Sequence, residues 1–163
     1  MGIKNSAKAL IIDNGKILVN KNKSSIGDCY PELPNGTIYY DLIGGGQNKY
    51  ETLEEAVKRE CLEEAGYFIE IDRLAAVYEE ISINDKFRDK YEKYAHKVHF
   101  LFMCHLTGDS VEPSADKDLD TLESQWIDIA DIQSISLYPK IIKSNLALVL
   151  KSANTLYLGS ERV

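Results

Sequence analysis

The segment from residue 37 to residue 66 constrains the fold more than any other part of the chain. Thr37–Ile43 is rich in β-branched and aromatic residues and runs directly into three glycines, Gly44–Gly46. The first stretch favours a strand, and the strand must end at the glycines, which supply no side chains to pack. We therefore expect a strand that ends in a loop of bare backbone.

A helix is expected shortly after this loop, over about Thr52–Ala65. Thr52 and Glu55 have the spacing of a capping box, and Gly66 stands where a helix ends at C′. Its apolar residues, four apart, are Leu53, Val57 and Cys61. The pattern predicts that this side of the helix packs against the sheet.

A neighbouring side of the same helix carries Glu60, Glu63 and Glu64 at positions i, i+3 and i+4. At this spacing their Cβ atoms lie about 5–6 Å apart, so the carboxylates repel one another unless a cation lies among them. Mg²⁺ prefers few carboxylates together with waters and phosphate oxygens, which a diphosphate substrate would supply. We expect Mg²⁺ as the cofactor, with Mn²⁺ as a substitute.

The spacing of the fixed residues resembles the Nudix box. Five residues separate Gly45 from Glu51, and seven separate Glu51 from Arg59. The matching residues are Gly45, Glu51, Arg59, Glu60, Glu63, Glu64 and Gly66. Cys61, Tyr67 and Ile43 depart from the family pattern at packing positions. The chain is therefore identified, by resemblance, as a member of the Nudix hydrolase family, MutT-like.

The resemblance implies an α+β fold, an α/β/α sandwich in which a mixed β-sheet lies between helices. The irregular mixture of expected strands and helices agrees with this class. We expect one Nudix hydrolase domain over residues 1–163, with a core of about 6–150 and a C-terminal helix over about 139–152. The implied reaction is hydrolysis of a nucleoside diphosphate linked to another moiety X, with a metal-activated water.

The resemblance also implies residue roles. Glycines at 44–46 would let backbone approach metal and phosphate, and Arg59 would orient a neighbouring carboxylate. The assignments are Glu63, Glu64 and Arg59 for catalysis, Glu60, Glu63, Glu64 and the Gly45 carbonyl for the metal, and Gly44, Gly45, Gly46 and Glu51 for the substrate.

The remaining elements follow from apolar periodicity and turn residues. In order, we expect a hairpin of Ala7–Ile12 and Lys16–Asn20, a connection over 21–36, strands Phe68–Ile71 and Leu74–Ile83, a charged loop Asn84–Lys93, a central strand Tyr94–Leu106, an acidic loop over 108–123, a short strand Gln125–Ile127 and the final helix.

Several further residues are candidates for the site. The acidic loop could supply the general base from Glu112, Asp116, Asp118, Asp120 or Glu123. Aromatic candidates for stacking on a base are Tyr39, Tyr40, Phe87 and Tyr138, and Arg88, Lys90 or Lys93 could reach a phosphate. The spacing of His96, His99 and His105 does not suit zinc, so these are expected to be surface or half-buried histidines.

The substrate itself is not fixed by the sequence. A proline that marks ADP-ribose pyrophosphatases would stand about fifteen residues past the box, where this chain has Ser82 and Ile83. Two other readings stay open, a Nudix-fold module that binds a nucleotide or protein without turnover, and an isopentenyl-diphosphate isomerase. The intact box carboxylates favour hydrolysis over both.

Charge and cysteine content restrict the partners. Asp and Glu exceed Lys and Arg by 26 to 19, giving a formal charge of -7, which disfavours polymeric nucleic acid. Three widely spaced cysteines indicate a reducing compartment, and no apolar run is long enough for a membrane span. We expect a cytoplasmic protein with a small-molecule nucleotide substrate, no membrane partner, and a homodimer as an open alternative.

Overall fold

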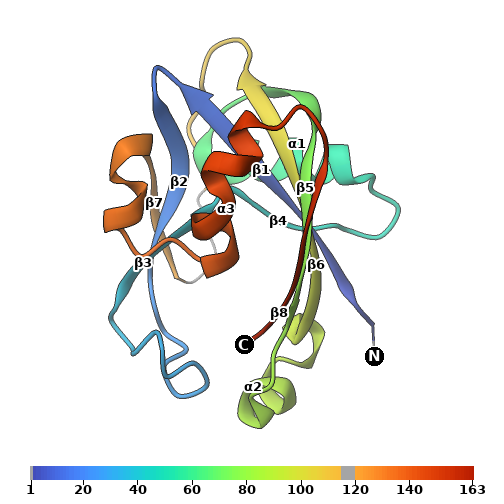
Figure 1. Ribbon diagram of the computed structural model, residues 1–163, viewed down its shortest axis with the longest axis vertical. Helices are drawn as coiled ribbons and strands as arrows, with labels where there is room; N and C mark the ends of the chain where they lie inside the picture. Colours follow the sequence, from blue (N-terminus) through green and yellow to red (C-terminus); the bar gives the residue numbers. More distant parts are fainter. Residues whose placement is uncertain (1, 115–119) are drawn as a thin grey trace.

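The computed structural model describes residues 2–114 and 120–163, and its described strands form a single mixed sheet (Figure 1). The path through this sheet is β3-β2-β1-β6-β5-β8, with β4 paired to β1 and β7 paired to β2. The strands are β1 (Lys4–Asp13), β2 (Lys16–Lys23), β3 (Ile38–Leu42), β4 (Gly44–Gly46), β5 (Ile69–Ile81), β6 (His96–Leu106), β7 (Thr121–Asp128) and β8 (Leu156–Arg162).

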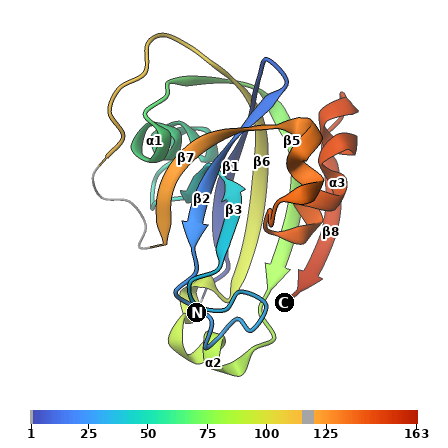
Figure 2. The ribbon, with the colours of Figure 1, turned by 90° about the vertical axis from the view of Figure 1, so that its left-hand side faces the viewer.

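Helices cover both faces of the sheet. They are α1 (Leu53–Ala65), α2 (Asp85–Lys90) and α3 (Lys140–Lys151), with short 3₁₀ turns η1 (Glu92–Tyr94) and η2 (Ile129–Ser134). In Figure 2, α1 lies on one side of the sheet and α3 on the other, while α2 lies at one end. This arrangement confirms the expected α+β sandwich.

Strand β1 explains why two cores form. Alternate side chains of a strand point to opposite faces. Ala9 and Ile11 pack with Val57 and Cys61 of α1, whereas Leu10 belongs to the cluster that contains α3. Because helices cover both faces of the sheet here, the part of β1 from Ala7 to Ile12 is apolar except for Lys8.

The expected hairpin turn, capping box and end of the first helix are confirmed. Asn14 and Gly15 take the positive φ angles of a tight hairpin turn between β1 and β2. Thr52 and Glu55 form both hydrogen bonds of the capping box at the start of α1. At the end of α1, Gly66 is left-handed, with a φ of 72°.

Three expectations about strands were wrong. Where two strands, Phe68–Ile71 and Leu74–Ile83, were expected, residues Ile69–Ile81 form one strand, β5. Its pairing with β6 continues through the polar residues with a register shift between Ile71 and Arg73 and a second between Leu74 and Ala76. The three glycines, expected as a loop, form β4, which pairs with β1. Strand β8 was not expected, because only its pairing with the distant β5 makes it a strand.

The charged segment Asn84–Lys93, expected as a loop, contains α2 and η1. The Asn84 side chain caps α2 by accepting from the Phe87 backbone N–H. The connection predicted over 21–36 also begins later, because β2 continues to Lys23 through its pairing with β3 and β7. In the described part of the chain, no helix has the length and apolar character that crossing a membrane requires.

Gly66 and Gly108 form a matched pair for testing why α1 ends where it does. Both have positive φ, but a Cβ at Gly66 would overlap the Val111 carbonyl oxygen, whereas nothing lies within 4 Å at Gly108. We expect Gly108→Ala to cost about 1 kcal/mol of unfolding free energy, from the left-handed backbone alone. Gly66→Ala should cost about 3 kcal/mol, because overpacking adds to that strain. Equal losses in urea unfolding would contradict this account.

Candidate active site

Strand β4 fits between β1 and α1 because it consists only of glycines. A Cβ at Gly44 would overlap the Ala7 carbonyl, and a Cβ at Gly45 would lie 2.6 Å from Glu60 Oε1. Gly44 also has a φ of 126°, which other residues rarely adopt. The glycines therefore place the Glu60 carboxylate directly against the main chain.

Arg59 forms hydrogen bonds with three acidic residues of the site. Its Nε and Nη2 donate to Glu51 over 2.7 and 3.0 Å, and Nη1 donates to Glu60 over 2.8 Å and to Glu63 over 3.0 Å. Nη2 also reaches the Gly46 carbonyl. The hydrogen bonds from Arg59 lower the pKa of Glu51. The bidentate pair fixes the guanidinium plane and, through it, the neighbouring carboxylates.

Glu64 points to different partners from the other two carboxylates. Its Oε2 accepts from the Gly44 backbone N–H over 2.8 Å and from Asn20 Nδ2 over 2.9 Å. Burial raises the pKa of Glu64 to about 7, although Lys8 opposes the rise. A carboxyl group with this pKa can both release and hold a proton near neutral pH.

Lys8 is a largely buried cation that sequence reasoning missed. Its Nζ donates to the carbonyls of Gly44 and Leu42 and contacts the Asp41 carboxylate at 3.4 Å. Burial would lower the pKa of Lys8, but Asp41 and Glu64 outweigh it and raise that pKa. The signal in the sequence was a lysine inside the apolar run of β1, since a buried lysine needs partners.

The expected cluster of three carboxylates is split into two groups. Glu60 and Glu63 face Arg59, whereas Glu64 faces Gly44. Among the described residues, no three His, Cys, Asp or Glu side chains are grouped so that they could hold a metal ion. The donors are nevertheless the hard oxygens that Mg²⁺ prefers, and Glu60 Oε1 lies 2.6 Å from the position that a Cβ on Gly45 would take. In donor chemistry and closeness to bare backbone, these residues fit a hard divalent cation.

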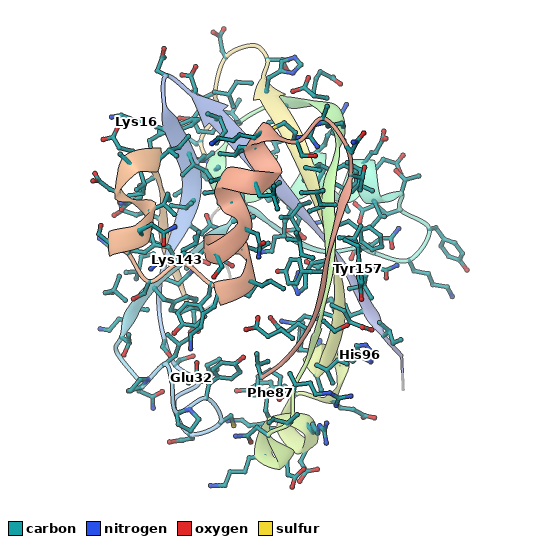
Figure 3. The ribbon with its side chains drawn as sticks, viewed as in Figure 1. Lys16, Glu32, Phe87, His96, Lys143 and Tyr157 are labelled. Carbon is teal, nitrogen blue, oxygen red and sulfur yellow. The ribbon has the colours of Figure 1, made fainter. Side chains whose placement is uncertain are left out.

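A cavity of about 540 Å³ extends from Gly45 and Glu60 across the sheet face that α3 covers. Its walls include the connection before β3, the start of α3, α2 and the end of β8. Figure 3 labels Glu32 and Phe87, two lining residues that lie below α3 in that view. Tyr30 and Phe87 meet edge to face, with centroids 6.1 Å apart, and so join two of the walls.

Only some of the candidate binding residues line the cavity. Tyr39, Phe87 and Tyr138 line the cavity, whereas Tyr40 packs against the core. The expected phosphate-binding cations Arg88, Lys90 and Lys93 do not line it, and Glu51 contacts Arg59 instead. The cations that do line it are Lys4, Lys8, Lys97, Lys140 and Arg162.

The acidic loop contributes nothing to the cavity lining in its described part. Asp120 accepts from Ser25, Glu123 pairs with Lys21, and Glu112 is exposed. Asp116 and Asp118 lie outside the described residues. The expectation of a general base from this loop stays a prediction, and the described geometry does not favour it.

The histidines differ from one another. His96 pairs with Glu79, and His105 pairs with Asp72, as half-buried or exposed residues do. His99 was expected to be of the same kind, but it is only 4% exposed and stacks on Tyr78 with ring centroids 4.4 Å apart. His99 is buried because it stacks on Tyr78, which belongs to the core cluster that contains α3.

Comparison with known proteins shows the family to which the chain belongs. A family model described as NUDIX domain matches residues 4–146. No curated protein matches the chain significantly.

Among solved structures, an ADP-ribose pyrophosphatase from Streptococcus suis is 23% identical and has a TM-score of 0.63, covering 96% of this chain and 99% of that one. The mutator protein MutT from Bacillus halodurans is 18% identical with a TM-score of 0.67, covering 98% and 90%. A MutT NUDIX hydrolase from Burkholderia pseudomallei is 26% identical with a TM-score of 0.54, covering 80% and 86%.

The buried His99 predicts how stability depends on pH. Burial, with help from Lys97 and Lys8, lowers the pKa of His99 from 6.5 to about 2. Below about pH 6.5 the unfolded chain therefore binds a proton that the folded chain does not, so stability falls as the pH falls. Between pH 7 and pH 5 the unfolding free energy of the wild-type protein should fall by about 2 kcal/mol more than that of His99→Phe, a variant that keeps a ring against Tyr78. If the unfolding free energies of the two proteins, measured with urea, fell equally between pH 7 and pH 5, this assignment would be contradicted.

Proposed function

This chain belongs to the Nudix hydrolase family and is a pyrophosphohydrolase of that family, and from this premise we propose that it uses a divalent cation to hydrolyse a nucleoside diphosphate linked to another moiety X. One observation carries the proposal. The box residues Gly45 and Glu60 line the same cavity as the aromatic residues Tyr39, Phe87 and Tyr138. A diphosphate at the box would thus place the rest of the substrate in the cavity.

The chain's own residues would act by positioning and by proton transfer. Arg59 holds Glu60 and Glu63 in fixed orientations, and the bare backbone at Gly45 lets the Glu60 carboxylate lie directly against the main chain. Glu64 uses Oε2 for Gly44 and Asn20, which leaves Oε1 to take a proton from the attacking water. Its pKa near 7 suits this role at neutral pH.

Family members generally use divalent metal ions, and we assign the cation to Glu60, Glu63, Glu64 and the Gly45 carbonyl. When bound, such an ion neutralises phosphate charge and lowers the pKa of a coordinated water. The hard oxygen donors of these residues favour Mg²⁺, with Mn²⁺ as a substitute.

The size and lining of the cavity support a nucleotide derivative. Its volume of about 540 Å³ is within the range of small-molecule sites, and Tyr39, Phe87 and Tyr138 offer ring faces or edges to a base. The Streptococcus suis protein of the same fold is named an ADP-ribose pyrophosphatase. The proposal therefore covers the class of diphosphates, with X left to experiment.

Hydrolysis can be tested directly by phosphorus NMR. Purified protein is incubated with Mg²⁺ and a panel of nucleoside di- and triphosphates, ADP-ribose, dinucleotides and nucleotide sugars. New phosphate resonances should grow with time for at least one compound and should be absent with excess EDTA. Mn²⁺ should restore turnover, whereas Ca²⁺, with its looser coordination, should support binding better than turnover. Saturable binding without turnover of any compound would instead favour a non-catalytic module.

The box carboxylates should matter more for rate than for folding. Glu63→Gln and Glu64→Gln keep an oxygen acceptor but lose the charge, so each should lower kcat by about 100-fold or more. Glu54→Gln is the matched control, since Glu54 lies exposed on the same helix and near none of these partners. Urea unfolding of Glu63→Gln and Glu54→Gln should agree within about 1 kcal/mol, whereas Glu64→Gln, which removes the charge that faces buried Lys8, should lose about 2 kcal/mol more. Wild-type turnover in both box variants would contradict the metal assignment.

A further inference from the structure

Lys4 places a positive charge beside the box glycines. Its side chain lies against Gly46, where an added Cβ would be 2.7 Å from the Lys4 Nζ. Both residues line the cavity, and Lys4 is only half-buried. Among the described residues, Lys4 is not one of those that bury a polar side-chain atom without a hydrogen-bond partner. Its ammonium group is therefore open to a ligand in the cavity.

The charge of Lys4 is not neutralised by an acid, unlike that of the other lysines in the cavity lining. Those three each pair with a carboxylate, Lys8 with Asp41, Lys97 with Glu80 and Lys140 with Glu32. In the part of the chain that the structure describes, no ion pair involves Lys4. A bound anion would therefore not have to displace a carboxylate from Lys4.

Arg162 is the remaining cation of the lining, and it lies far from the box. It belongs to β8, whereas Gly46 belongs to β4, and the sheet runs from β4 through β1, β6 and β5 to β8. At about 4.8 Å between neighbouring strands, these four steps separate the two residues by about 19 Å along the sheet. A diphosphate at the box would thus meet Lys4 and not Arg162.

An aromatic ring holds the ammonium group of Lys4. Its Nζ lies over the ring of Tyr94, 4.1 Å from the centroid. A ring face attracts a cation through its quadrupole and carries no net charge, so the positive charge stays available to an anion. Hydrogen bonds from an ammonium group to a phosphate oxygen are about twice as strong as those between neutral groups.

Lys4 and the box acid Glu60 approach β4 at consecutive residues. Glu60 lies against Gly45, and Lys4 lies against Gly46. Consecutive residues of a strand are about 3.3 Å apart along it and face opposite sides, so the acid and the lysine flank the strand. A diphosphate held at Gly45 can therefore present a phosphate oxygen to Lys4.

We propose that Lys4 is a substrate-binding residue that donates a hydrogen bond to a phosphate oxygen of the diphosphate. The inference rests on the proposed function, because it takes the diphosphate to lie at the box. It adds that a residue of the first strand, outside the box, supplies part of the affinity. A local cation of this kind also explains how a chain with a formal charge of -7 receives an anionic substrate.

The test measures binding, so it does not depend on turnover. The probes are α,β-methylene analogues of ADP, GDP, CDP and UDP, titrated calorimetrically in magnesium buffer at about 50 and about 500 mM NaCl. Lys4→Met removes the charge at similar length, and Lys4→Arg keeps it. Lys93→Met is the matched control, because the Lys93 Nζ lies over the same Tyr94 ring at 4.8 Å but Lys93 does not line the cavity.

At low salt, Lys4→Met should bind the best analogue about tenfold or more weakly than the wild-type protein. Lys4→Arg should stay within about threefold of the wild type, and Lys93→Met within about twofold. The loss in Lys4→Met should shrink at high salt, where charges are screened, whereas a loss caused by disturbed packing would be the same at both concentrations. If Lys4→Met does not fold by circular dichroism, Lys4→Gln takes its place.

Four results would overturn the proposal. They are wild-type affinity in Lys4→Met, a loss of the same size in Lys93→Met, a loss that does not depend on salt, and no binding of any analogue by the wild-type protein.

The outcomes also separate this inference from the proposed function. Binding that depends on Lys4, without hydrolysis of any compound, would support the role of Lys4 and reject the proposed activity. Hydrolysis with analogue binding that does not depend on Lys4 would do the reverse.

Discussion

The close approach of bare backbone to an acidic helix is the constraint on which the rest of the site depends. Gly44 lies against the Ala7 carbonyl, and Gly45 lies against the Glu60 carboxylate, in spaces that a Cβ would fill. This packing brings the Gly44 N–H to Glu64 and the Gly46 carbonyl to Arg59. A side chain at Gly44 would push β4 away from β1, and one at Gly45 would push it away from Glu60 of α1, so either would disturb these contacts.

Opposite charges stabilise this approach from the two sides of β4. Lys8 lies on the cavity side and donates to the Gly44 carbonyl, while Glu64 accepts from the Gly44 N–H. Each group is largely buried, so each would be costly alone. Each charge favours the ionised form of the other, because Lys8 lowers the pKa of Glu64 and Glu64 raises the pKa of Lys8. The two peptide groups on either side of the Gly44 Cα are thus each bound by a buried charge, the first by Glu64 and the second by Lys8.

Local signals predicted the box helix well, because its determinants lie close together in the sequence. The capping box joins Thr52 to Glu55, and Gly66 follows directly after the helix. The split among the carboxylates could not be predicted in this way. It depends on Asn20, which is 44 residues away from Glu64, and on the eight-residue reach from Arg59 to Glu51.

The cavity was less predictable still, because its walls meet only through long-range pairing. Strand β8 exists through its parallel register with β5, and the contact between Tyr30 and Phe87 joins segments with no common sequence pattern. His99 gave no sequence signal beyond its place in β6, since its burial comes from neighbours on both sides. The family was therefore recognisable from one helix and its flanking glycines, while the residues that line the cavity required the fold.

This division between local and long-range determinants has a consequence for specificity. The residues proposed for bond cleavage lie between Gly44 and Glu64, within one strand and one helix. The cavity floor comes from β1, β5 and β6, and its walls come from four other segments. Substitutions in the walls can change the bound moiety without moving Arg59 or its partners. The box alone therefore does not specify X, and we expect substitutions among the other residues that line the cavity to change substrate preference.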